Sequence, residues 1–311
     1  MLKILHWSDQ HGSTGKVSQT KALADMIGVD ANVCTGDMVP DYYEQDISSM
    51  DLDDTLFILG NHDVILQSGT NPTEYDWSQK PTMAQAYAKY FRKYAGKAFT
   101  MNENQTWWHR EWSDKSVMML GLDVQATGAD ATTHMAWLDD RLRYAKDNGY
   151  SVIILGHAPA SSLHCSQNSW LDRHYYTSMI PDTASFEVWY PFMRQSYAKV
   201  CDWADAGGDV AMWLTGHEHA DSLFVGGNAS KFPVVSVSST VADRYSDLFR
   251  GADGTVNAVC ANYMEYVPEE SVLRMYRLGA GRSRNGTKRR CCVWDYRESE
   301  WIEWLDREEG R

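Results

Sequence analysis

The sequence predicts an α/β fold, and two observations support this class. Short apolar runs of strand length alternate with segments whose apolar residues have helical spacing. Several of these runs end in glycine followed by polar or charged residues, as buried parallel strands do. The chain has 311 residues, 43% of them hydrophobic, which is enough to bury a substantial core. Since no Pro-rich linker, internal repeat or low-complexity tract divides it, a single domain over residues 1–311 is expected.

The N-terminal part of the chain predicts a strand, a loop and a helix in that order. Residues 2–7 are an apolar run, and residues 16–27 have the spacing of a helix. Residues 31–35 and 55–59 are two further runs with the length and composition of buried strands. Three strand ends are therefore expected to meet at one edge of a sheet, where open α/β sheets bind their ligands.

Further along, strands and helices alternate around two insertions that are rich in aromatic residues. Strands are expected at residues 116–122, 151–155, 210–214 and 234–237, and helices at residues 83–94, 134–146 and 186–204. The insertions cover about residues 64–113 and 158–200 and are interpreted as a candidate cap. Two alternating segments near the C-terminus predict a β-hairpin within about residues 263–304.

Composition and charge exclude several classes of protein. No stretch approaches the roughly 18–20 apolar residues of a membrane helix, and no basic region followed by an apolar segment opens the chain. The formal net charge of −13 disfavours general binding to nucleic acid, because that affinity comes mainly from Lys and Arg. The six cysteines include no Cys-x-x-Cys pair, so neither a disulfide framework nor a zinc-thiolate site is indicated. A cytoplasmic protein without a membrane partner is expected.

Five short clusters of polar residues stand at the ends of predicted strands. They are Asp9-Gln10-His11, Gly36-Asp37, Gly60-Asn61-His62-Asp63, Gly156-His157 and Gly216-His217-Glu218-His219. With average residue usage, Asp-x-His occurs by chance in roughly a third of chains of this length, whereas Gly-Asn-His-Asp occurs in about one in a thousand. The clusters in this order are therefore interpreted as a functional pattern.

Taken together, the clusters have the chemistry of one binuclear metal site. Divalent transition ions bind imidazole and carboxylate groups, and two ions about 3.5–4 Å apart need at least one carboxylate that bridges them. Such a pair holds the attacking and departing oxygens of an in-line phosphoryl displacement. The clusters therefore indicate a site for hydrolysis of a phosphoric ester.

The same clusters resemble the motifs of the calcineurin-like metallophosphoesterase superfamily. The family pattern reads Asp-x-His, Gly-Asp, Gly-Asn-His-Asp or Gly-Asn-His-Glu, His, and Gly-His-x-His, and the match extends over residues 9–219. The resemblance implies a metallophosphoesterase-type β-sandwich of two mixed sheets flanked by helices, to which this chain adds its aromatic-rich insertions.

The resemblance also implies a role for each motif residue. The implied ligands of the first metal ion are Asp9, His11 and His219, and those of the second are Asn61, His157 and His217. Asp37 bridges both ions. His62 protonates the leaving oxygen or stabilises the transition state, and Asp63 orients the His62 ring, as in other His-carboxylate pairs.

The implied activity is hydrolysis of a phosphoric ester that depends on two divalent metal ions. A hydroxide that bridges the ions attacks phosphorus in line with the leaving oxygen, and His62 acts as the general acid. Imidazole and carboxylate ligands suit Mn, Fe, Zn, Ni or Co, and the choice among these metals stays open.

One departure from the family pattern bears on the substrate. The residues after Asp37 read Met38-Val39-Pro40-Asp41, whereas the Ser/Thr phosphatases of the superfamily have Asp-Arg-Gly and use its arginine to hold phosphate. A phosphoprotein phosphatase is therefore disfavoured, and a phosphodiester or nucleotide substrate is preferred. A nuclease and a broad phosphomonoesterase stay open as alternatives. Arg173 or His174 in the second insertion are candidate replacements for the missing cation.

Other features have less specific interpretations. A different class of protein would be a catalytically silent, metal-stabilised binding or structural component of a larger assembly. The aromatic residues around Trp107, Trp108 and Trp112 and within residues 170–190 form either a stacking platform for a flat ligand or the core of a cap. The isolated histidines are interpreted as ordinary surface or core-edge side chains: His6, His109, His134 and His164. The basic residues within 282–290 are interpreted as a solvated hairpin turn.

Overall fold

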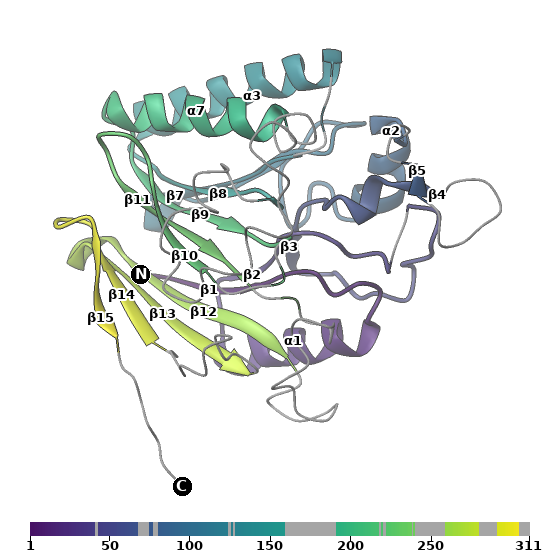
Figure 1. Cartoon of the computed structure of the whole chain (residues 1–311), viewed down its shortest axis with the longest axis horizontal. Coiled ribbons are helices and arrows are strands. Elements are labelled where there is room, and N and C mark those ends of the chain that lie inside the picture. Colours follow the sequence, from purple (N-terminus) through teal and green to yellow (C-terminus); the bar gives the residue numbers. More distant parts are fainter. Residues whose placement is uncertain are drawn as a thin grey trace, which may run out of the picture.

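The structure is a computed structural model of the chain, and two large β-sheets face each other in it. It describes residues 1–40, 43–67, 75–76, 80–123, 126, 128–158, 191–217, 219, 222–237, 239, 259–279 and 291–304. Figure 1 shows helices on the outer sides of both sheets. The described residues therefore form the predicted α/β sandwich of two mixed sheets.

The first sheet has seven strands in the order β15-β14-β13-β12-β1-β2-β3 within the described residues. Its strands are β1 (Leu2–Trp7), β2 (Ala31–Cys34), β3 (Thr55–Phe57), β12 (Cys260–Val267), β13 (Val272–Gly279), β14 (Cys291–Asp295) and β15 (Glu300–Trp304). The pairs β1-β2 and β2-β3 are parallel, and the other pairs are antiparallel.

The C-terminal part of this sheet is larger than the sequence predicts. The predicted hairpin is present as the antiparallel pair β13-β14, and β12 and β15 flank it, so that four antiparallel strands extend the sheet from β1. β12 pairs with strands on both sides and is buried along most of its length. Such a central strand does not show the strict alternation of apolar and polar residues by which an exposed hairpin is recognised.

The second sheet has six strands in the order β10-β11-β9-β8-β7-β6 within the described residues. Its strands are β6 (Trp108–Trp112), β7 (Val117–Gly121), β8 (Ser151–Leu155), β9 (Val210–Thr215), β10 (Ser222–Gly226) and β11 (Phe232–Ser236). The central strands β7, β8, β9 and β11 are parallel, and the two edge strands are antiparallel to their neighbours. A small separate sheet pairs β4 (Leu66–Gln67) with β5 (Tyr75–Asp76).

The helices follow the predicted positions with shifted ends. They are α1 (Thr14–Ile27), α2 (Met83–Ala86), α3 (Gly128–Asn148) and α7 (Pro191–Asp205), with short turns η1 (His62–Val64), η2 (Tyr87–Phe91), η3 (Ser113–Lys115) and η6 (Pro268–Glu270). α3 and α7 cover the outer face of the second sheet, and α1 covers the first (Figure 1). Residues 186–190 of the predicted helix 186–204 lie outside the described residues. The described helices include none with the length and hydropathy of a membrane span.

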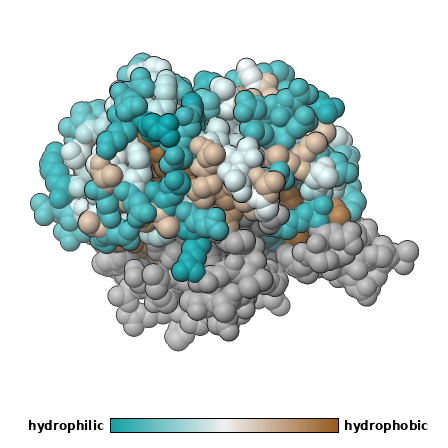
Figure 2. Space-filling model, turned by 90° about the horizontal axis from the view of Figure 1, so that it is seen from above, coloured by the Kyte–Doolittle hydropathy of each residue, from teal (hydrophilic) through white to brown (hydrophobic). Residues whose placement is uncertain are grey.

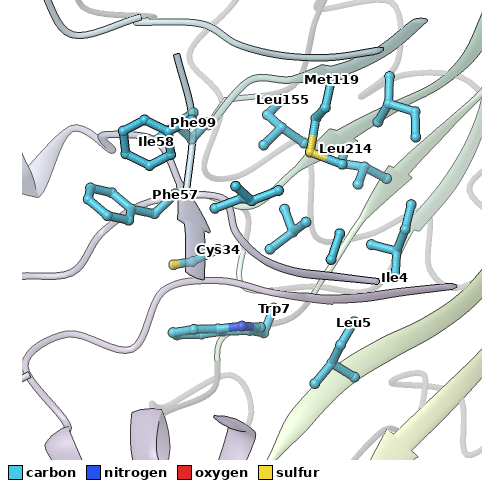
Figure 3. Packing of buried hydrophobic residues seen from close by; sticks show 14 of the residues in the cluster. Ile4, Leu5, Trp7, Cys34, Phe57, Ile58, Phe99, Met119, Leu155 and Leu214 are labelled. Atoms are coloured by element: carbon cyan, nitrogen blue, oxygen red, sulfur yellow. The ribbon is translucent and has the colours of Figure 1, made fainter. Parts of the chain in front are cut away.

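The main core lies between the two sheets. Figure 3 shows Ile4 of β1 in one cluster with Met119, Leu155 and Leu214, which come from β7, β8 and β9. A second core packs the outer face of the six-stranded sheet against α3 and α7. Because the central strands are buried on both faces, they have the nearly continuous apolar composition that predicted them.

Trp108 of the first aromatic insertion belongs to the main core, and Trp107 stacks on His134 of α3. Trp107 and Trp108 are 1% and 0% exposed, and the Trp108 ring stacks on Phe99 with 4.9 Å between ring centroids. The Trp108 Nε1 donates a hydrogen bond to the Phe57 carbonyl at 2.7 Å. These two rings are therefore packing residues rather than an open stacking platform. The aromatic residues within 170–190 lie outside the described part of the chain, as do Arg173, His174 and His164.

Candidate metal centre

The polar clusters come together at one edge of the sandwich. Asp9, Asp37 and Asn61 follow β1, β2 and β3, and His157 and His217 follow β8 and β9. Backbone hydrogen bonds join the loops to one another. Asp9 N donates to Gly36 O at 3.0 Å, His11 N donates to Asp37 O at 3.1 Å, and Gly216 N donates to His157 O at 2.8 Å. The edge predicted for ligand binding therefore carries every candidate metal ligand.

The first group of ligand atoms contains Asp9, His11, Asp37 and His219, and these atoms lie within 4.8 Å of one another. His11 Nε2 lies 3.1 Å from His219 Nε2 and 4.0 Å from Asp37 Oδ2. His219 Nε2 lies 3.4 Å from Asp9 Oδ1. Two carboxylates and two imidazoles thus converge on one point from three loops.

The second group contains Asp37, His157 and His217, again within 4.8 Å of one another. His157 Nε2 lies 3.3 Å from Asp37 Oδ2 and 3.0 Å from Asn61 Oδ1. His217 Nδ1 lies 2.8 Å from the same Asn61 oxygen. Asp37 is therefore the residue that belongs to both groups, as a bridging ligand must.

These separations fit a shared metal ion in each group. Ligand atoms about 2.1 Å from one ion lie about 3.0 Å apart at a right angle and about 3.4 Å apart at a tetrahedral angle. The closest pairs in the two groups, at 2.8–3.4 Å, match those values. The residues present therefore fit two divalent ions.

Two of the histidines are also held as metal-bound histidines are. His157 Nδ1 lies 2.6 Å from the Thr35 carbonyl oxygen, and His11 Nδ1 lies 3.1 Å from the Pro40 carbonyl oxygen. A ring N–H that donates to a carbonyl fixes the tautomer and leaves the opposite nitrogen, Nε2, as the metal ligand. No sequence pattern marks Thr35 and Pro40, because any residue can offer a backbone carbonyl.

The motif glycines let the loops pack this closely. A Cβ on Gly60 would lie 2.1 Å from Asp37 Oδ1, and a Cβ on Gly36 would lie 2.6 Å from the Gly60 backbone nitrogen. A Cβ on Gly216 would lie 1.9 Å from Ser8 Oγ and 2.7 Å from Asp9 Oδ2. The glycines of the pattern are therefore part of the geometry of the site.

The backbone of the ligands is strained. Positive φ angles occur at five candidate ligands: Asp9 (54°), His11 (42°), Asp37 (54°), His217 (69°) and His219 (52°). Non-glycine residues rarely adopt this region, and such outliers gather at functional sites where the surrounding structure holds them. The loops are therefore shaped to aim side chains.

The charges of the buried carboxylates and histidines at this edge depend on one another. Burial and the neighbouring charge of Asp37 raise the pKa of Asp63 to about 6. Burial opposes ionisation of Asp37, but the positive charges of His157 and His62 hold its pKa well below the usual range. Burial likewise opposes protonation of His157, but the Asp37 carboxylate raises its pKa to about 9. A protonated His157 and the Asp37 carboxylate therefore stabilise each other, and a divalent ion held by both residues would take the place of that proton.

The two residues proposed for catalysis have different surroundings. The His62 backbone N donates to Asp37 Oδ1 at 2.9 Å, and its ring meets the His11 ring edge-on with 4.9 Å between centroids. The Asp63 carboxylate accepts hydrogen bonds from three backbone N–H groups, those of Gly60 (2.8 Å), Met38 (2.8 Å) and Val39 (3.0 Å). Asp63 thus joins the loops after β2 and β3, a contribution that the sequence analysis does not include.

Comparison with known families agrees with this site. The family model for calcineurin-like phosphoesterases matches residues 2–221, which is more than half of the chain. The chain therefore belongs to the calcineurin-like phosphoesterase family. It is a metallophosphoesterase, a hydrolase of phosphoric esters that depends on two divalent metal ions. Among curated protein sequences none matches the chain.

Solved structures align with the chain at low sequence identity, and the first of the three below supports the fold alone. A dimetal phosphatase from Danio rerio aligns with a TM-score of 0.54 and 10% identity, covering 90% of this chain and 97% of that one. A Streptococcus pneumoniae protein described as a predicted phosphoesterase aligns with 15% identity, 90% coverage of both chains and a TM-score of 0.38. An NAD nucleotidase from Haemophilus influenzae aligns with 13% identity, 97% coverage of this chain, 53% of that one and a TM-score of 0.44.

Proposed function

We propose that this metallophosphoesterase hydrolyses a phosphodiester or a nucleotide by in-line displacement, with His62 as the general acid. The observation that carries the proposal is the pair of ligand groups that share Asp37. When bound, two divalent ions supply positive charge for the phosphoryl oxygens and lower the pKa of water. The predicted ligand assignment, with Asp9, His11 and His219 around one ion and Asn61, His157 and His217 around the other, is part of this proposal.

The surroundings of His62 support its role in proton transfer. Its backbone is tied to Asp37, so the residue stays at the edge of the ligand groups. Asp63 follows His62 in the short turn η1, and its carboxylate joins the loops after β2 and β3. Asp63 therefore holds the backbone from which the His62 ring projects. A ring in that place donates a proton to the leaving oxygen, and orientation of the ring by Asp63 is part of the proposal.

The loop after Asp37 supports the preference for a diester or nucleotide. Met38 and Val39 are fully buried, and their backbone N–H groups donate to Asp63. Because Met38-Val39-Pro40-Asp41 contains no Lys or Arg, this loop presents no cationic side chain where the Ser/Thr phosphatases of the superfamily place an arginine. A dianionic monoester depends more on such a cation than a diester does, because a diester has only one phosphoryl charge.

We also infer a cytoplasmic location and a small phosphoester as the physiological partner. The cysteines in the described part of the chain are free thiols, which suits a reducing compartment. The net charge of −13 disfavours a nucleic acid substrate.

The test compares hydrolysis of bis(p-nitrophenyl) phosphate and p-nitrophenyl phosphate by metal-stripped protein resupplied with Mn²⁺. We expect diesterase activity that falls about 10²–10⁴-fold in His62→Ala, the usual contribution of a general acid. Metal content and Tm of His62→Ala should stay unchanged, because His62 is not a proposed ligand.

The other outcomes are equally informative. A preference for the monoester would keep the mechanism and overturn the proposed substrate class. No hydrolysis of either substrate by protein that holds two ions would contradict the proposal and favour a metal-stabilised binding or structural component. A His62→Ala variant that retains full activity would remove the general acid from the mechanism.

A further inference from the structure

The first aromatic insertion contacts the short turn that carries His62 and Asp63. The Tyr90 hydroxyl donates a hydrogen bond to the backbone carbonyl of Asp63 at 2.9 Å. Tyr90 is 1% exposed, so water does not compete for this bond. The insertion is therefore bonded directly to the residue beside the proposed general acid.

The turn η1 has little internal support. It spans three residues, and Val64 N donates to Asn61 O at 3.3 Å, which is long for a backbone hydrogen bond. A single helical turn orders several residues for one such bond, so it is not stable alone. Contacts from other segments must therefore hold His62 in place.

Three segments supply such contacts. From the metal centre, Asp37 Oδ1 accepts a hydrogen bond from His62 N. From the loop before β3, Tyr43 N donates to Ile65 O at 2.7 Å, just after the turn. The third contact is the Tyr90 hydroxyl, which is the part of this support that the insertion provides.

Tyr90 lies in a rare type of turn. In η2, Arg92 N donates to Tyr87 O, five residues earlier, at 2.9 Å, so the turn is wider than that of an α-helix. Turns of this kind are uncommon and occur frequently at functional sites. The next residue, Phe91, stacks on Phe57 of β3 with 5.1 Å between ring centroids. The segment that carries Tyr90 is therefore anchored to the strand that leads into η1.

Lys89 joins the same segment to residues 43–45. Its Nζ donates to the Tyr43 carbonyl and, at 2.7 Å, to the Gln45 carbonyl. The same atom lies 4.5 Å from the centroid of the Tyr43 ring and 4.9 Å from that of the Tyr90 ring. The negative faces of aromatic rings attract an ammonium group. Residues 43–45, η1 and η2 therefore each contact the other two.

We propose that Tyr90 is a positioning residue of the general acid. Its hydroxyl holds the Asp63 carbonyl and so fixes the backbone from which His62 reaches the leaving oxygen. This inference rests on the proposed function, because it needs His62 as the general acid. A general acid must lie within hydrogen-bond reach of the atom that it protonates, and a displacement of about 1 Å can cost about a hundredfold in rate.

The test removes only the hydroxyl, in Tyr90→Phe, and varies the leaving group of the substrate. Bis(p-nitrophenyl) phosphate releases a weaker base than diphenyl phosphate does, so it depends less on a general acid. Tyr90→Phe should lower kcat about threefold for bis(p-nitrophenyl) phosphate and about thirtyfold for diphenyl phosphate. If the protein prefers monoesters, p-nitrophenyl phosphate and phenyl phosphate make the same comparison.

A second measurement asks whether Tyr90 acts through His62. Tyr90→Phe should slow the unmodified protein but not His62→Ala, because that variant has no general acid to position. Elemental analysis should find the same metal content in Tyr90→Phe as in the unmodified protein.

Tyr296→Phe is the matched control. The Tyr296 hydroxyl also donates to a backbone carbonyl, that of Ala211, which lies at the end of β9 opposite to His217. Its removal deletes the same kind of bond and should leave both kcat values unchanged. An equal loss for both esters in Tyr90→Phe, no loss for either, or a further loss in the His62→Ala background would overturn the proposal.

Failure of this inference is distinguishable from failure of the proposed function. His62→Ala alone tests the general acid. If His62→Ala loses activity and Tyr90→Phe loses none, the proposed function stands and the inference falls. Full activity in His62→Ala would overturn the proposed general acid, and this inference with it.

Discussion

His157 and His134 are both completely buried, yet they lie in regions of opposite character. Both nitrogens of His157 have polar neighbours, the Thr35 carbonyl on one side and Asp37 and Asn61 on the other. His134, on α3, is sandwiched between the rings of Trp107 and Phe192, with centroid distances of 4.3 and 4.1 Å.

Within the part of the chain that the structure describes, neither nitrogen of His134 has a hydrogen-bond partner. Burial alone holds the pKa of His134 well below its usual value, whereas Asp37 raises that of His157 to about 9. The comparison teaches that a buried histidine is a candidate ligand when its partners are carboxylates on strand-end loops. Between aromatic rings it is a packing residue.

The largest expected difference between the two buried histidines is the effect of removing their side chains. His157→Ala takes away a ligand of the second ion, and we expect activity to fall about a thousandfold or more. Elemental analysis should find one ion per chain. The matched variant at the other buried histidine, His134→Phe, should retain both ions and full activity. A His157→Ala protein with two tightly held ions would show that the second site is assigned wrongly.

A methyl group on a motif glycine should have the next largest effect. Gly60→Ala introduces a Cβ that would lie 2.1 Å from Asp37 Oδ1, so the loop must move. We expect a loss of about 1–3 kcal/mol of unfolding free energy and weaker metal binding. Gly15→Ala is the control, because Gly15 lies in α1 with nothing within 4 Å of the added Cβ. This control should gain up to about 1 kcal/mol.

Equal unfolding free energies for the two variants, measured by urea denaturation, would contradict the role of Gly60 in packing the loops. Metal titration of the same two proteins gives a second readout. Only Gly60→Ala should need a higher Mn²⁺ concentration for half-saturation.

Replacing His134 by an apolar ring between Trp107 and Phe192 should stabilise the protein. A buried polar group without a partner destabilises by about 1–3 kcal/mol, and His134→Phe removes two such atoms while keeping a flat ring. We expect the unfolding free energy at pH 7.5 to rise within that range, measured by urea denaturation. A decrease would mean that the space between Trp107 and Phe192 cannot take the larger ring.

The smallest expected effect is the acid sensitivity of His134 between its two aromatic rings. The folded pKa of His134 lies below its unfolded value of about 6.5, so the unfolded chain binds an extra proton below that pH. The contribution of neutral His134 to the unfolding free energy is complete above pH 6.5 and is lost as the pH falls. At pH 5.5 the loss is about 1.4 kcal/mol. The difference in unfolding free energy between His134→Phe and the wild type should grow by that amount from pH 7.5 to pH 5.5. An unchanged difference would contradict the lowered pKa of His134.

The sequence predicts which residues gather at the candidate metal centre better than it predicts the surrounding packing, for a physical reason. Asp9, Asp37 and His157 each follow a strand, and parallel strand ends meet at one edge whatever the rest of the chain does. The hydrogen bonds of Asp63 to Met38 and Val39 depend instead on how two loops approach each other. No pattern in the sequence records that approach.

The same limit applies to His134 and to the strand order. His134 meets Trp107 and Phe192 only after three distant segments have packed together, so the sequence predicts it as a surface or core-edge residue. β12 lies beside β1 although most of the chain separates them. Periodicity predicts that residues 2–7 form a strand, but not which distant segment becomes its neighbour.

Metal stoichiometry of Asp37→Asn tests the central claim most directly. If Asp37 bridges two ions, the purified wild type should hold two divalent ions per chain, and Asp37→Asn should hold fewer than one. Elemental analysis after dialysis measures both values, and far-UV circular dichroism confirms that the variant is folded. Two ions retained by folded Asp37→Asn, or a wild type that saturates with a single ion, would contradict the binuclear site.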